Sequence, residues 1–342
     1  MKILFITHQL SNETVKADSY INNIVSDMVL HGLKSVYGKD VIDYPGAWYM
    51  FKDEVKKKTF DITNLWANGF TYYDEFDNYA SVDRSDIENK IDNNYFEYII
   101  YGSIDNSKKY LDKAINSKSK IIFIDGSDST NLEFSSNKKI LLFKRELIKR
   151  SQNIHPLNIC IPKNKIIKSL NKKPTNLLAP LIPYRYKTYV YKKESDYYDM
   201  WQNSIFGIAH PPPWGNWWES VKYYEMLMNG CIPLFLNLKN CPADTLTLLP
   251  KKELIDIYNN YSWILSKYFP FTIYRKEYLT SDKIISYLKN FLKRNYSAEN
   301  FIQKFPEINN VRHNLVEYTK KYLTTEYLAK YIVNTAKDFY SS

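Results

Sequence analysis

The stretch ESVKYYEMLMNGCIPLFLNLKNCP, from Glu219 to Pro242, places a helix-like segment directly before a buried-looking run. The apolar residues of VKYYEMLM recur at helical spacing, and Asn229-Gly230 forms a natural helix stop. The run CIPLFL that follows is typical of a core strand. The stretch therefore predicts a helix that ends against a strand of an α/β sheet.

The polar side of this helix holds two carboxylates and a cation. A helical wheel places Glu219, Lys222, Glu225 and Asn229 opposite the apolar stripe, with Glu225 close to its edge. We expect Glu225 to be partly shielded and Lys222 to be within reach of both glutamates. A solvated helix face with local ion pairs explains the same pattern, so the surroundings of the helix decide between the two interpretations.

The segment before the helix favours a ligand site. SIFGIA (204–209) predicts a strand, and the loop HPPPWGNWW joins it to the helix. Ligands of open α/β sheets bind beyond the carboxyl ends of strands, where a helix N-terminus offers N–H groups to an anion. We expect Asn216 to cap the helix, Gly215 to permit close approach of the backbone, and His210 to face the ligand. Such a site suits the ribose diol and the diphosphate of a nucleotide.

The rest of the chain alternates short apolar runs with helix-compatible segments, which predicts a largely parallel α/β sheet in each half. We expect two domains, 1–170 and 171–342, and helices around 316–339 that cross back to the first domain. No GxGxxG or P-loop motif is present. The expected strands of the first half are 2–7, 40–45, 96–102, 120–125, 139–147 and 157–162, and the expected helices are 19–37 and 108–115.

Composition limits the class of protein. The formal net charge is +10, which favours anionic partners, but the lysines are scattered and no nucleic-acid-binding motif occurs. Three cysteines form no disulfide framework, and neither a signal peptide nor a transmembrane run is evident. We therefore expect a cytoplasmic protein that does not bind nucleic acid, with peripheral contact to a membrane surface left open.

Other residues are candidates for chemistry. Asp125 and Asp128 follow the strand KIIFI and are candidates for a general base, a metal ligand or an acceptor-binding group. An Asp-Gly turn with capping aspartates is the alternative. His31, on the long first helix, is a third catalytic candidate. Arg185 is placed to neutralise a leaving diphosphate, and Trp217 to stack on a sugar or base; a surface role and core packing are the respective alternatives.

The opening stretch resembles the donor-binding segment of GT-B-fold glycosyltransferases. VKYYEMLMNGCIPLFLNLKNCP is similar to a pattern of exostosin-like and several bacterial or viral families, in which [R/K]xxE precedes a small loop and GCIP. GNWWESVKYYE is similar to a GWDxxRHYE form. The resemblance implies two Rossmann-like domains facing a cleft, an acceptor-side first domain and a nucleotide-sugar-binding second domain. It also implies that Glu225 binds the donor ribose and that Lys222 lies near the diphosphate.

The expected activity is transfer of a sugar from a nucleotide-diphosphate sugar to a glycan, lipid-linked or protein acceptor. Because neither a DxD motif nor a metal-ligand cluster is present, we expect no metal and no cofactor. The alternative is a non-catalytic nucleotide-sugar or glycan-binding protein of the same fold, since Lys222 and Asn216 replace a more usual arginine and aspartate.

Overall fold

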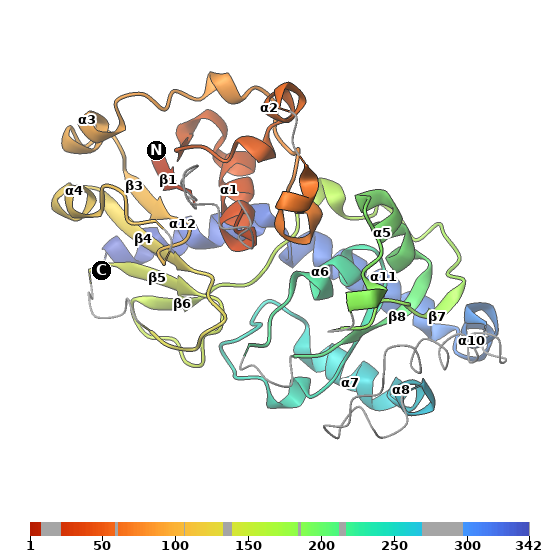
Figure 1. The fold of residues 1–342 in the computed structure, drawn as a ribbon. Coiled ribbons are helices and arrows are strands. Elements are labelled where there is room, and N and C mark those ends of the chain that lie inside the picture. The colour runs from red at the N-terminus through yellow and green to blue at the C-terminus, as the bar shows by residue number, and fades with distance from the viewer. Residues whose placement is uncertain are drawn as a thin grey trace. The chain divides into compact units, whose positions relative to one another are not determined.

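A computed structural model describes residues 1–7, 22–58, 61–105, 107–132, 139–183, 186–211, 217–268 and 297–341. The chain forms two compact units (Figure 1). Unit 1 comprises Met1–Lys165, Pro242–Thr247 and Tyr322–Ser342. Unit 2 comprises Ile166–Cys241 and Leu248–Lys321. The chain thus leaves unit 1 after Lys165, forms unit 2 with one short return to unit 1 at Pro242–Thr247, and ends in unit 1 with its last helix.

Unit 1 is built on a six-stranded parallel sheet of order β2-β1-β3-β4-β5-β6. Its strands are runs rich in Ile, Leu, Phe and Tyr, and nearly all of their residues are buried, as expected of a parallel sheet covered on both faces. The chain order reverses beside β1, which pairs with both β2 and β3. The strands are β1 (Ile3–Ile6), β2 (Val41–Tyr44), β3 (Tyr98–Tyr101), β4 (Lys120–Asp125), β5 (Leu141–Lys144) and β6 (Ile154–Pro156).

The helices of unit 1 include a closely packed pair. Asn23 caps α1 (Ile24–Tyr37) by accepting hydrogen bonds from the backbone N–H groups of Val25 and Ser26. The C-terminal helix α12 (Thr325–Ser341) packs against α1, β4 and β5. Gly32 permits this approach, because a Cβ atom there would lie 2.0 Å from the carbonyl oxygen of Thr325. The shorter helices are α2 (Lys52–Lys57), α3 (Ile87–Asp92) and α4 (Leu111–Asn116).

Unit 2 holds a three-stranded parallel sheet of order β7-β8-β9. Its strands are β7 (Asn176–Leu178), β8 (Ser204–Ala209) and β9 (Ile232–Phe235). The helices of unit 2 within the described residues are α5 (Glu194–Gln202), α6 (Val221–Met228), α7 (Lys251–Tyr261), α8 (Trp263–Tyr268), α10 (Ala298–Lys304) and α11 (Glu307–Tyr322).

The expected fold class is confirmed: this is an α/β protein with two parallel, Rossmann-like sheets. One expected strand is wrong. The strand near the end of unit 1 is Ile154–Pro156 rather than 157–162, because the apolar run at 157–161 is buried as irregular extended chain and Ile161 pairs with Thr324 instead. No helix among the described residues has both the length and the apolar character needed to span a bilayer.

Candidate functional site

Helix α6 begins later than expected. Ser220 is its N-cap and Val221 its first residue, so Asn216 does not cap it. The helix ends at Met228, and Gly230 follows with a φ of +70°, a left-handed conformation that favours glycine. Because β8 and β9 are parallel, α6 runs back between them, and its N-terminus lies at the carboxyl edge of the sheet. The first turn of α6, which contains Lys222, therefore lies at the carboxyl edge of the sheet.

Glu225 is buried, which contradicts the expectation that it would be partly exposed. The helical wheel placed Glu225 at the edge of the apolar stripe, but α5 also packs against this part of α6. The Tyr197 hydroxyl of α5 donates a 2.6 Å hydrogen bond to Oε2 of Glu225. Burial first, and then the neighbouring Glu225, raise the pKa of Tyr197 well above its ordinary value, so the phenol stays protonated as a donor. The carboxylate is thus desolvated and held in a fixed position.

Two further side chains of the segment also meet tyrosines. Glu219 is buried and accepts a hydrogen bond from the Tyr224 hydroxyl. Lys222 is half-buried, and its Nζ lies 4.8 Å from the centre of the Tyr189 ring, within cation–π range. Burial lowers the pKa of Lys222, while the charge of Glu225 opposes that shift.

His210 lies where β8 ends, and α6 reaches it through Tyr223. The Tyr223 hydroxyl donates a 3.0 Å hydrogen bond to the backbone oxygen of His210. Burial lowers the pKa of the imidazole, which favours its neutral form. Trp217 is half-buried in the segment that leads to α6. Between the end of β8 and the second turn of α6, the chain thus carries an imidazole whose neutral form is favoured, an indole, a half-buried ammonium group and a buried carboxylate.

Three of the expected donor-binding residues, Arg185, Gly215 and Asn216, lie outside the described residues. The proposed roles of Arg185 and Gly215 therefore stay predictions.

Asp125 and Asp128 belong to an ionic cluster at the carboxyl edge of the unit 1 sheet. The register of β4 and β5 sets Asp125 opposite Lys144, whose side chain is fully buried and pairs with the carboxylate at 2.9 Å. Lys144 also donates to the Ser127 hydroxyl at 2.7 Å. Arg145 pairs with Asp128, which is half-exposed. Both candidate carboxylates thus have cationic partners, and Asp128 is the one that solvent reaches.

His31 is not part of this cluster. Its Nδ1 lies 2.8 Å from the Thr325 hydroxyl, its Nε2 lies 3.7 Å from Glu75, and its ring stacks on Phe76. Burial alone raises the pKa of Glu75, but the nearby imidazole of His31 and the charge of Lys165 lower it to about 2. His31 thus lies in a buried network that joins α1 to α12.

Sequence reasoning missed three partners. Lys144 and Arg145 are adjacent charges within an otherwise apolar run, KILLFKREL, and that interruption was the available signal. Tyr197 was hidden among 31 tyrosines, none of which spacing alone distinguishes.

No group of three or more His, Cys, Asp or Glu side chains suited to a metal ion occurs within the described ranges. No protein-family model matches the sequence, and no curated protein matches it. The candidate site therefore has to be interpreted from its own chemistry.

Proposed function

We propose that this protein is a GT-B-type glycosyltransferase that moves a sugar from a nucleotide-diphosphate donor to a glycan, lipid-linked or protein acceptor. The observation that supports the proposal is the position of Lys222 and Glu225 on α6, the helix that starts at the carboxyl edge between β8 and β9. This edge is where open α/β sheets bind nucleotides.

In this proposal each group has one task. The N–H groups of the first turn of α6, together with Lys222, hold the diphosphate. Glu225 accepts hydrogen bonds from the ribose diol, and the Tyr197 hydroxyl fixes the carboxylate for that purpose. His210 and Trp217 contact the sugar or the base from the end of β8 and the segment that follows it. In unit 1, Asp128 is the more accessible of the two carboxylates proposed as the base.

The test is calorimetric titration of nucleoside diphosphates and nucleotide sugars into the wild type, Lys222→Gln and a matched control, Lys304→Gln. Lys304 is an exposed lysine of α10 that belongs to neither candidate site. We expect Lys222→Gln to weaken binding by about tenfold or more, as for loss of a charge-assisted hydrogen bond, and the control to bind as the wild type does. Equal affinities of all three proteins contradict the donor site.

A second candidate is a nucleotide-sugar or glycan-binding protein without turnover. The pairing of Asp125 with a fully buried lysine favours it, because a catalytic base must accept a proton from the acceptor. Transfer or donor hydrolysis by the wild type, abolished in Asp128→Asn, supports the enzyme. Donor binding with no turnover supports the binding protein.

The proposed transfer needs no metal. Activity in excess chelator should equal activity without it, and complete loss that Mn²⁺ or Mg²⁺ restores contradicts this part of the proposal.

A further inference from the structure

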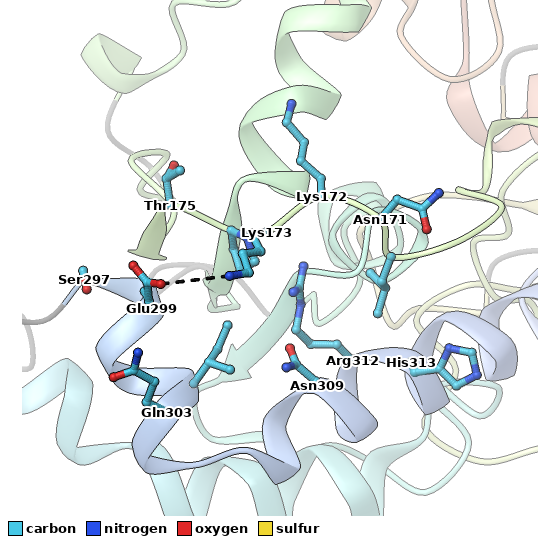
Figure 2. A pocket seen from close by; sticks show the side chains of 13 residues that line it. Asn171, Lys172, Lys173, Thr175, Ser297, Glu299, Gln303, Asn309, Arg312 and His313 are labelled. Carbon is cyan, nitrogen blue, oxygen red and sulfur yellow. Dashed lines mark ion pairs between the residues drawn. The ribbon is translucent and has the colours of Figure 1, made fainter.

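Unit 2 contains a cavity at the opposite edge of its sheet from the candidate donor site. Its volume is about 740 Å³, and it lies between the loop that precedes β7 and the helices α10 and α11 (Figure 2). The loop leads into the amino end of β7, and Gly230, which Arg312 contacts, precedes the amino end of β9. The polar side chains at this cavity include those of Asn171, Lys172, Lys173, Glu299, Asn309 and Arg312.

Arg312 is the buried cation of this cavity. It projects from α11 toward the loop that bears Lys172 and Lys173 (Figure 2) and is only 2% exposed. Its Nε donates a 2.7 Å hydrogen bond to the carbonyl oxygen of Gly230. Its Nη2 is buried and has no hydrogen-bond partner in the described part of the chain. A buried guanidinium donor without an acceptor is costly, so an acceptor is expected there.

No neighbouring acid neutralises Arg312 within the described ranges. The buried Cys231 thiol is close enough to interact with it electrostatically, but burial raises the pKa of that thiol, so it stays neutral. The carboxylate at the cavity, Glu299, lies 4.0 Å from Lys173. The described residues thus leave the guanidinium charge uncompensated.

The rim of the cavity adds cations in weak, exposed pairs. Lys173 pairs with Glu299, and their side chains are 92% and 66% exposed. Lys172 pairs with Asp199 at 3.3 Å, and both of these side chains are also exposed to solvent. Pairs of this kind contribute little free energy, so both ammonium groups can turn to an incoming anion at small cost. The loop and α11 also present the amides of Asn171 and Asn309.

We propose that this cavity binds the phosphate group of a small phosphorylated molecule, with Arg312 as the buried contact and Lys172 and Lys173 at the rim. A guanidinium offers planar paired donors that suit a phosphate, and two lysines supply the remaining charge. The volume leaves room for the rest of the molecule beside the phosphate. The site is distinct from the α6 edge and does not depend on the proposed transfer reaction.

The experiment is titration of inorganic phosphate, in chloride buffer at constant ionic strength, into the full chain and four variants. Arg312→Gln removes the buried charge, and Lys172→Gln/Lys173→Gln removes the rim. Lys304→Gln controls for net charge, because Lys304 is the last residue of α10 and does not line the cavity. Lys222→Gln controls for phosphate binding at the α6 edge. Circular dichroism checks that each variant is folded.

We expect Arg312→Gln to weaken phosphate binding by about tenfold or more and the double lysine variant to weaken it by several fold, with Lys304→Gln unchanged. Lys222→Gln removes only phosphate bound at the α6 edge, so it should keep the binding that Arg312→Gln loses. If Arg312→Gln fails to fold, the phosphate affinity of the double lysine variant, compared with the wild type, tests the proposal. Absence of phosphate binding by the wild type, equal binding by the cavity variants, or loss in Lys222→Gln alone overturns the proposal. The two proposals can fail separately. Lys222→Gln tests the nucleotide donor site on α6, whereas Arg312→Gln and the double lysine variant test the phosphate site in the cavity.

Discussion

Glu225 and Tyr197 form a buried pair between α6 and α5, and the pair makes the stability of unit 2 depend on a candidate site residue. A carboxylate on a solvated helix face would contribute little to stability. Removal of the buried Glu225 carboxylate, in contrast, leaves the Tyr197 hydroxyl without a hydrogen-bond acceptor, which lowers stability. The structure therefore changes what substitution at Glu225 is expected to do.

We predict that Glu225→Ala lowers the free energy of unfolding by about 1–3 kcal/mol because the Tyr197 hydroxyl loses its acceptor. Glu225→Ala/Tyr197→Phe should cost less than the sum of the two single changes, since Phe needs no partner. Urea denaturation of the four proteins measures this, and strictly additive costs contradict it. In the same proteins, Tyr197→Phe should retain more donor affinity than Glu225→Ala if the carboxylate itself contacts the ribose.

Asp27, in the first turn of α1, makes stability depend on pH. Burial raises the pKa of its carboxyl from near 3.8 to about 7, although hydrogen bonds from Tyr49 and Asn22 oppose the shift. Because the folded state holds this proton more tightly than the unfolded state, the stabilisation is fully present below about pH 4 and is lost as the pH rises to 7.

We predict that Asp27→Asn, which mimics the protonated acid, gains stability relative to the wild type as the pH rises, by up to about 4 kcal/mol between pH 4 and 8. The free energies of unfolding of the two proteins should agree most closely at the acid end. A difference that does not vary with pH contradicts the assignment to Asp27.

Among the elements, the pair α1 and α12 shows how packing opposes local preference. Alanine is a better helix former than glycine, so Gly32 on α1 is locally unfavourable. Its absent side chain is what lets α12 approach, with the Ala329 Cβ also 3.3 Å from the position that a Cβ of residue 32 would take. The glycine therefore has a packing role that helix propensity does not reveal.

We predict that Gly32→Ala destabilises the protein by about 1–3 kcal/mol, as for an overpacked core position. The matched control is Lys330→Ala, on the exposed side of α12, which should change stability by about 0.5 kcal/mol or less. A stabilised Gly32→Ala variant would mean that α12 moves away at no cost.

The elements also show what sequence could and could not reveal. The periodicity of 19–37 and the apolar runs at 2–7, 40–45 and 204–209 correctly predicted α1, β1, β2 and β8, because those signals are local. The burial of Glu225 depends on α5, and the pairing of Asp125 with Lys144 depends on the register of two strands. Such contacts are set by tertiary packing, which a wheel drawn for one isolated helix leaves out.

At the scale of the whole molecule, unit 1 is discontinuous in sequence. Five residues of α12 contribute apolar surface to its interior: Leu328, Ala329, Ile332, Val333 and Ala336. The first 165 residues hold all six strands of the sheet but lack this helix. The integrity of unit 1 is therefore expected to depend on the last segment of the chain.

We predict that a chain truncated after Lys321 loses protection of the amides of β4 and β5 in hydrogen exchange, because these strands lose their contacts with α12. The amides of β7, β8 and β9 should keep their protection, since unit 2 loses no residue. Wild-type protection in the unit 1 strands of the truncated chain contradicts the prediction.

The return of the chain to unit 1 also has a consequence during synthesis on the ribosome. The strands of unit 1 emerge first, yet Gly32 and its neighbours on α1 have no covering helix until residues 325–341 are made. At 5–20 residues per second, the 304 residues from the end of α1 to the end of α12 (341 − 37) take roughly 15–60 s. During that time the nascent chain displays an apolar face while unit 2 is being translated. Native unit 1 can therefore be completed only after unit 2 has been made, and its uncovered face is the surface that a ribosome-associated chaperone would meet.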